Sequence, residues 1–536
     1  MNKAGTVFLF TALLMPLLRA ELFADPDGKL FKKPGYAETR PGVINRTELT
    51  AVFSGEEAEL DFRKSYLSSE AQIFTALYEG LFSYNPITLE PVPAAAAAWQ
   101  LSEDKKIWTF TIRQNARFQN GEPLRAEDFR ASWLSMLDPK RNSPYSSLYD
   151  IIEGARDYRL GKTTDPAAVG ISTGGEKTLI VRLNAPASFF PSMLCHHSFC
   201  PIDPAAVEGK NDPLSNGPFF ISEKGKGYLV LEKNSRYWDA DRVILTKITV
   251  KFTEDADEAS ALWNSGEARW IAGNVNIEAL TDRSGIVVNP MFATHYYYIR
   301  SQGIWKDHRL RRALALALPW EELREGHILP AETLVYRMPG YPEIGGLETD
   351  VEEARRLLAE AGYPGGAGLP ELVIRITPSE DADRIGRLMA ASWMDKLGIP
   401  VKLDVIPFNR YFQSLKQDNY QVGSTTWIGD FADPYTFLQM WRRDSNLNDA
   451  LHDDDDYEEL MEKSMTEEGQ DRFAILGEAE QLLLDRGTVL PISYSPALNI
   501  IDTGELDGWF PNALDIHPFK YFRFKAFKPL PGVALR

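Results

Sequence analysis

The stretch Thr425-Thr426-Trp427-Ile428-Gly429-Asp430-Phe431-Ala432-Asp433-Pro434 decides how this chain is interpreted. It follows Asn419-Tyr420-Gln421-Val422, a run with the alternation typical of a strand. A carboxylate at the end of a buried strand is costly unless a cationic group meets it. The stretch therefore predicts a cationic partner for Asp430, whereas Asp433-Pro434 is typical of a turn. From the motif alone, a turn or cap is the plainer role for Asp430 too.

The bulk composition places this stretch in a large, acidic, globular protein. The chain has 536 residues, which predicts about two to four domains because a single core stops growing well below that length. Lys and Arg number 58 against 76 Asp and Glu, giving a formal net charge of -18. This balance argues against nucleic acid as a partner, because phosphates would be repelled.

The N-terminal residues 1–24 have the features of a cleavable signal peptide. Lys3 is followed by an apolar run from Thr6 to Leu18 that is too short to span a membrane, and Ala20 and Ala24 offer cleavage positions. No cysteine lies nearby for lipid attachment. We therefore expect an exported, periplasmic protein without a lipid anchor.

The only cysteines, Cys195 and Cys200, enclose His196 and His197. Because export favours oxidation, a disulfide between the two cysteines is the leading prediction. A metal site that uses the two histidines as well is the alternative, although the spacing matches no standard zinc pattern. No cofactor is expected.

The order of predicted elements suggests an α+β unit up to about residue 200 and an α/β domain with a largely parallel sheet later in the chain. Strands are predicted at 107–113 and 178–183 in the first part. In the second part, predicted helices alternate with predicted strands: helices at 309–318, 348–361, 382–397 and 472–484, and strands at 372–376, 401–405 and 420–425.

One short motif raises the alternative of a secreted serine hydrolase. Gly170-Ile171-Ser172-Thr173-Gly174 matches the pattern of a nucleophile elbow, which needs a strand before Ser172 and a helix after it. Here a strand is predicted after it instead, so the context is a hairpin. We expect no enzymatic activity.

Several segments together resemble the oligopeptide- and dipeptide-binding proteins of bacterial ABC importers. They occur in the order found in that family and span nearly the whole chain after residue 24. The matching segments are Tyr78-Glu79-Gly80-Leu81 and residues 108–113, 118–129, 216–219, 231–234, 237–238, 307–318, 361–364 and 427–434.

The resemblance implies a two-lobed α/β periplasmic-binding-protein fold, with a hinge, a cleft between the lobes and an extra α+β domain inserted in the first lobe. The first lobe would comprise residues 25–67, 201–292 and 493–536. The inserted domain would comprise residues 68–200, and the second lobe residues 293–492.

The resemblance also implies a site for a peptide. Asp430 would bind the peptide α-ammonium, and the strand near Thr425 to Gly429 would pair with the peptide backbone. Tyr66 and Ser68 would lie where a strand of the first lobe pairs with the ligand. Further candidates are the neighbours of Asp430 and aromatic residues elsewhere in the chain: Trp427, Ile428, Gly429, Tyr145, Phe408 and Tyr494.

The chain also departs from the family pattern. Leu415 and Ser424 stand where some relatives carry arginines that hold the peptide C-terminus, although Lys416 is adjacent. Arg300 stands where many relatives have asparagine, and it either contacts ligand or pairs with a nearby acid.

The function that follows is an extracytoplasmic receptor, expected to be a monomer, that delivers oligopeptides to the permease of an ABC importer. Two alternatives stay open. One is the same fold with a metal chelate, haem or a sugar as its cargo, and the other is the hydrolase that uses Ser172.

Overall fold

The computed structural model describes residues 46–210 and 213–525. The predicted signal peptide, residues 1–24, lies outside these ranges. Within them, no helix is both long and apolar enough to span a bilayer.

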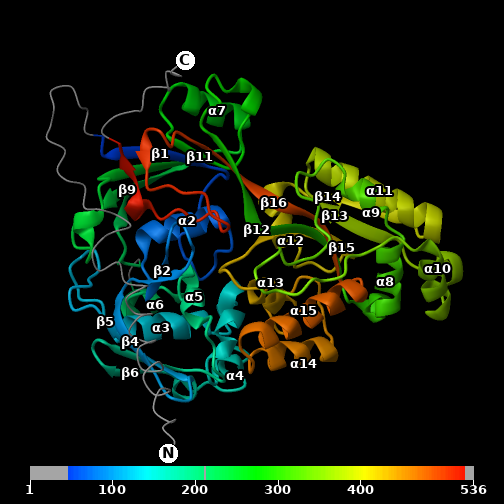
Figure 1. Cartoon of the computed structure of the whole chain (residues 1–536), viewed down its shortest axis with the longest axis horizontal. Helices are drawn as coiled ribbons and strands as arrows, with labels where there is room; N and C mark the ends of the chain where they lie inside the picture. Colours follow the sequence, from blue (N-terminus) through cyan, green and yellow to red (C-terminus); the bar gives the residue numbers. More distant parts are fainter. Residues whose placement is uncertain (1–45, 211–212, 526–536) are drawn as a thin grey trace, which may run out of the picture.

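The largest sheet of the described structure is mixed and has ten strands, in the order β14-β13-β15-β12-β16-β11-β1-β10-β9-β8. Figure 1 shows one end of it in the part that contains β1, β9 and β11, and the other end in the part that contains β13, β14 and β15. The strands are β1 (Glu48–Phe53), β8 (Phe219–Gly225), β9 (Tyr228–Lys233), β10 (Lys247–Phe252), β11 (Trp270–Ala272), β12 (Ile286–Ile299), β13 (Leu372–Ile376), β14 (Val401–Val405), β15 (Val422–Ile428) and β16 (Val489–Ile501).

The two longest strands, β12 and β16, run from one part of the molecule into the other (Figure 1). They pair antiparallel along most of their length, but the register shifts between Pro290 and Thr294 and again between His295 and Tyr296. A sheet bends where its register shifts, because the ladder of hydrogen bonds is interrupted there. The bend separates two lobes.

An additional domain sits on the first lobe and contains a four-stranded antiparallel sheet in the order β4-β5-β7-β6. Figure 1 shows it below α2. Its elements and those that lead into it are α2 (Ser68–Leu77), β2 (Phe82–Tyr84), β3 (Pro91–Pro93), β4 (Ala96–Leu101), β5 (Ile107–Ile112), α3 (Ala126–Met136), η1 (Pro144–Ile151), α4 (Ala155–Arg159), β6 (Ile171–Gly175), β7 (Thr178–Arg182), α5 (Phe190–Met193), η3 (His197–Phe199) and α6 (Pro204–Val207).

The second lobe packs helices on the sheet formed by β13, β14 and β15. Its core includes the fully buried Trp393 of α11 and Leu314 of α8, whose carbonyl accepts a hydrogen bond of 2.8 Å from the Trp393 indole. The α-helices outside the inserted domain are α7 (Ala256–Asn264), α8 (His308–Leu316), α9 (Trp320–Arg324), α10 (Val351–Glu360), α11 (Glu380–Leu397), α12 (Phe408–Ser414), α13 (Tyr435–Leu438), α14 (Asp455–Ser464) and α15 (Gly469–Asp485), and the short 3-10 helix η8 (Gln439–Trp441) follows α13.

Candidate ligand-binding site

A cavity of about 490 Å³ lies between the lobes. Its volume is in the range expected for a small-molecule or short-peptide site. Residues of the second lobe line one side, from β12, β15 and α12 and the segment 440–450. Residues of α2, β2, η1 and the segment 195–200 line the other side.

Strand β15 offers this cavity an open backbone edge. On one side β15 pairs antiparallel with β12 over its whole length, from Val422 to Ile428. On the other side it pairs with β13 at Val422 alone. Gly429 N–H donates to Phe292 O at 2.8 Å, so the odd-numbered residues bond to β12. Because an antiparallel strand alternates the direction of its hydrogen bonds, the N–H and C=O groups of Thr426 and Ile428 point to the open edge.

Asp430 lies just beyond the end of β15 and is only 9 % exposed. Its Oδ2 accepts a hydrogen bond of 2.8 Å from the Thr436 hydroxyl, which in turn accepts one of 2.8 Å from the Asp430 N–H. The Tyr84 hydroxyl, from the inserted domain, donates to the Asp430 carbonyl at 2.7 Å. Thr436 therefore holds the carboxylate of Asp430, and Tyr84 holds its backbone from the other side of the cavity.

The charge of Asp430 has no cationic counterpart within the described part of the chain. Its ion-pair neighbour is His196, whose Nε2 lies 3.6 Å from Oδ1. Burial and the adjacent His197 hold the pKa of His196 well below 6.5, so this ring is neutral at pH 7. Burial raises the pKa of Asp430 to about 7, although hydrogen bonds from Thr436 and Tyr145 oppose the rise. A cation that enters the cavity beside Asp430 would therefore stabilise its ionised form.

The three residues before Asp430 all line the cavity. Trp427 is partly buried against Tyr145, with ring centroids 6.3 Å apart, and its indole N–H is buried without a hydrogen-bond partner in the described structure. Ile428 contributes its backbone edge. Gly429 is required by close packing, because an added Cβ would stand 2.4 Å from Phe292 Cδ1.

Asp433 does more than form a turn. It accepts from the N–H of Tyr435 at 2.9 Å, as a turn residue does. It also forms a two-pronged ion pair with the buried Arg472 of α15, at 2.7 and 2.9 Å. The guanidinium lies over the Phe189 ring, 3.9 Å from its centroid. This pair fixes the segment that carries Asp430.

Several predicted site residues meet across the cavity. Tyr145 of η1 is buried beside His196, with ring centroids 4.5 Å apart. Phe408, the first residue of α12, is half exposed, and its ring packs on Phe412 at 5.7 Å. Tyr66 also packs on Phe412, with ring centroids 5.5 Å apart, so it joins the two lobes.

The expectation of a first-lobe strand at Tyr66 and Ser68 is wrong. Tyr66 lies in a non-helical segment before α2, and Ser68 is the first residue of α2. Both still line the cavity. The helix begins here because Ser68-Ser69-Glu70 supplies an acidic first turn, with Glu70 accepting from Ser65 and from the N–H of Glu59.

Tyr494 does not line the cavity. It is buried on β16, where its hydroxyl bonds to the Thr333 hydroxyl at 2.5 Å and its ring packs edge-on against Tyr336. Arg300 is also outside the cavity. It is buried under the 417–449 region, donating to the carbonyls of Gln417 and Asp449 and pairing with Asp418 at 3.2 Å.

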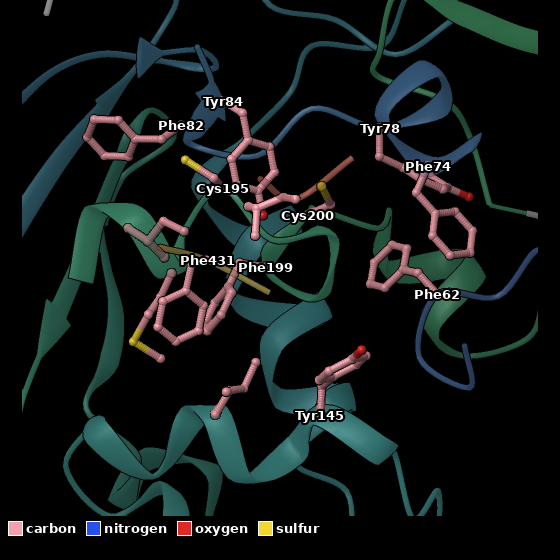
Figure 2. Packing of buried hydrophobic residues seen from close by; sticks show 14 of the residues in the cluster. Phe62, Phe74, Tyr78, Phe82, Tyr84, Tyr145, Cys195, Phe199, Cys200 and Phe431 are labelled. Atoms are coloured by element: carbon pink, nitrogen blue, oxygen red, sulfur yellow. The ribbon is translucent and has the colours of Figure 1, made fainter. Parts of the chain in front are cut away.

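Cys195 and Cys200 are both free and buried, so the expected disulfide is absent from this structure. Both line the cavity, and Figure 2 shows them among apolar side chains beside Tyr84. The turn of η3 between them gives each a separate environment: Cys195 Sγ faces Pro191 O at 3.6 Å, and Cys200 follows the end of η3. No cluster of metal-ligating side chains occurs among the described residues.

Ser172 is not in a nucleophile elbow. It is an exposed residue of β6, which pairs with β7 as a hairpin. The strand–turn–helix geometry that exposes a nucleophile is therefore missing at this serine.

Residues that the sequence reasoning missed complete the site. Tyr84 and Thr436 both hold Asp430, and Tyr411 bonds to the β15 backbone at Ser424. Only Thr436 is close to Asp430 in sequence, because it lies six residues later, in α13. Tyr84 is 346 residues away in sequence and reaches the site through the fold.

Comparison with known proteins agrees with this architecture. The profile of a family described as bacterial extracellular solute-binding proteins, family 5 Middle, matches residues 90–449. The oligopeptide-binding protein OppA of Bacillus subtilis is 29% identical over 448 residues, covering 78% of this chain and 82% of that protein. The periplasmic murein peptide-binding protein MppA of Escherichia coli is 29% identical over 491 residues, covering 85% of this chain and 89% of that protein.

Solved structures show the same fold. A structure of MppA from Escherichia coli has a TM-score of 0.80 at 26% identity and covers 90% of this chain and 99% of that one. The unliganded open form of MppA has a TM-score of 0.63 at 26% identity, covering 90% and 98%. The fold is the two-lobed α/β fold of these binding proteins, with an inserted α+β domain, as the family resemblance implied. The chain belongs to the family 5 bacterial extracellular solute-binding proteins.

Proposed function

We propose that this protein is a receptor for peptides with a free N-terminus, which it binds in the cavity between its lobes. The observation that carries the proposal is Asp430. It is a buried carboxylate at the end of an open strand edge, and its one ion-pair neighbour within the described residues is a neutral histidine. An α-ammonium is a cation at neutral pH and supplies three N–H donors to such a carboxylate.

The open edge of β15 supports backbone recognition. With the amine at Asp430, beyond the C-terminal end of β15, the peptide chain runs back along the strand and is therefore antiparallel to it. Thr426 and Ile428 then exchange hydrogen bonds with the ligand backbone. Recognition of the backbone leaves the ligand side chains free to vary. The names of relatives agree, since both OppA and MppA are named for the peptides that they bind.

The setting of this receptor follows from the same proposal. It is an exported, periplasmic monomer that delivers its peptide to the permease of an ABC importer and catalyses no reaction. Its first lobe comprises residues 25–67, 201–292 and 493–536, its inserted domain residues 68–200, and its second lobe residues 293–492. The higher similarity to one MppA structure than to the open form supports a closed arrangement here.

The experiment compares one peptide with a free amine and with an N-acetylated end. We expect Asp430→Asn to weaken binding of the free-amine peptide by about a hundredfold, as loss of a buried charge pair does, and to change binding of the acetylated peptide little. Isothermal titration calorimetry gives both affinities.

Glu480→Gln is the matched control. Glu480 is also fully buried with a pKa raised by burial to about 7, but it accepts from Leu334 and Val335 away from the cavity. Its substitution should leave the ratio between the two peptides unchanged. Equal weakening of both peptides by Asp430→Asn would rule out the amine role.

A further inference from the structure

Tyr411 occupies the place where the open edge of β15 begins. This buried residue of α12 is only 2 % exposed, and it lines the cavity. Its hydroxyl lies between two diverging strands. It donates to Ser424 O of β15 at 2.8 Å and contacts Arg375 O of β13 at 3.1 Å.

The same hydroxyl accepts from the N–H of Ser424 at 3.1 Å. Both backbone groups of Ser424 are therefore already paired. Ser424 is the residue of β15 that would otherwise continue the open edge, because it has the same orientation as Thr426 and Ile428. β13 cannot pair there, since its ladder with β15 consists of Ile374 and Val422 alone. At Ser424, the Tyr411 hydroxyl thus makes the two backbone hydrogen bonds that a neighbouring strand would otherwise make.

We propose that Tyr411 is a specificity-determining residue that limits backbone pairing to the first three or four residues of the bound peptide. This inference rests on the proposed function, in which the peptide lies antiparallel to β15 with its amine at Asp430. When the first ligand residue lies opposite Ile428, its amine points toward Asp430. Asp430 follows Ile428 by two residues.

The register then follows from the alternation of an antiparallel ladder. The third ligand residue lies opposite Thr426 and finds free N–H and C=O groups. The fifth lies opposite Ser424 and finds both groups occupied by Tyr411. A longer peptide must leave the strand before that point, and its fifth and later residues bind without the ladder.

The test uses alanine peptides of two to six residues with free ends. For the natural protein we expect affinity to rise up to three or four residues and then to level. For Tyr411→Leu, which removes the hydroxyl and opens space at Ser424, we expect the affinity for five residues relative to three to increase about tenfold. Tyr411→Phe removes only the hydrogen bonds, and we expect an increase of about threefold.

Tyr420→Phe is the matched control. Tyr420 is a buried tyrosine of the same lobe, and its hydroxyl bonds to Tyr298 and to Leu415 O, each at 2.9 Å, away from the β15 edge. This substitution should leave the length profile unchanged. If Tyr411→Phe matches the control, or if the natural protein already gains affinity from three to five residues, the proposal is wrong.

The two proposals fail in different measurements. The affinity of the natural protein for the tripeptide tests whether peptides are bound at all. The affinity for the five-residue peptide relative to the three-residue peptide tests the role of Tyr411. Tyr411→Phe allows this comparison even if Tyr411→Leu does not fold.

Discussion

At the scale of single residues, burial of the Asp430 carboxylate is the main unfavourable feature of the empty site. A carboxylate removed from water is destabilised unless charge or hydrogen bonds compensate. Thr436 and Tyr145 compensate only partly, because the pKa still rises to about 7. A ligand cation removes the remaining cost. The residue that weakens the empty closed state is thus the one that makes binding favourable.

This balance predicts that binding releases protons below neutral pH. Because burial raises the pKa of Asp430 to about 7, the empty closed site at pH 6 holds a proton on the carboxyl group. An ammonium favours the carboxylate and lowers its pKa, so the proton leaves on binding. Above about pH 8 the direction reverses, because the free amine of the peptide must gain a proton.

Calorimetry at pH 6 in buffers with different ionisation heats measures how many protons are released for each peptide bound. We expect close to one proton per peptide, and none with Asp430→Asn. No release by the natural protein at pH 6 would mean that Asp430 is already ionised before the peptide binds.

The local motif drew attention to Asp430, an acid beside a tryptophan at the end of an alternating run, but alone it favoured a turn or cap, and the amine role came from the family resemblance. That resemblance gave the wrong place for Tyr494, whose surroundings are set by Thr333 and Tyr336 far away in the chain. A disulfide was predicted for Cys195 and Cys200 because sequence spacing carries no information on the direction of the two side chains. Contacts between segments that are far apart in sequence could not be predicted from local sequence patterns.

At the scale of elements, the segment from Gly429 to Thr436 is the part that positions the site. The N–H of Gly429 joins it to β12, and Asp433 joins it to α15 through Arg472. The strands β13 and β14 lie at their expected bounds, because alternation of apolar and polar residues indicates a strand. Strand β15 extends three residues further than predicted, to Ile428, since pairing with β12 continues there.

The close packing around Gly429 predicts that even a substitution by alanine is harmful. Gly429→Ala places a Cβ against the Phe292 ring, at 2.4 Å from Cδ1, so the end of β15 must move. We expect a loss of about 1–3 kcal/mol in the free energy of unfolding and a clear loss of peptide affinity, because Asp430 moves with its neighbour.

Gly345→Ala is the control for this change, measured by urea unfolding and calorimetry. A Cβ at Gly345 would meet only the end of the Gln481 side chain, at 3.3 Å, and that side chain can rotate away. Equal effects of the two substitutions would show that β15 tolerates displacement at its end.

At the scale of the whole molecule, contacts between the inserted domain and the second lobe hold the cavity closed. Asn446 donates to Ser143 O at 2.7 Å and to the Ser146 hydroxyl at 2.8 Å. Arg156 of α4 donates to Asp444 at 2.7 Å. The two lobes meet through segments about 290–300 positions apart in sequence, which explains why no sequence pattern indicated these contacts.

Asp444 is the centre of this contact, because it also pairs with the buried Arg159 at 3.1 Å. Burial acts to raise the pKa of Asp444, but Arg159 and Arg156 outweigh it and lower that pKa, so the residue is ionised at neutral pH. In Asp444→Asn, Arg159 keeps Asp150 at 2.5 Å and its hydrogen bond of 2.7 Å to the backbone carbonyl of residue 444, but it loses the ion pair across the lobes. The closed state is then less stable relative to the open state, while the cavity itself is unchanged.

A ligand that binds the closed state loses affinity in proportion to the population of that state. We therefore expect Asp444→Asn to weaken binding of every peptide by about five- to twentyfold, with or without an N-acetyl group, since the loss does not involve Asp430. Glu468→Gln removes another contact between the lobes, the exposed pair of Lys105 and Glu468 at 2.9 Å, and should cost less than about threefold. Calorimetry provides the affinities, and small-angle scattering of the ligand-free variant should show a larger radius of gyration. If Asp444→Asn and Glu468→Gln have the same small effect, closure is held by the ligand alone and not by this ion pair.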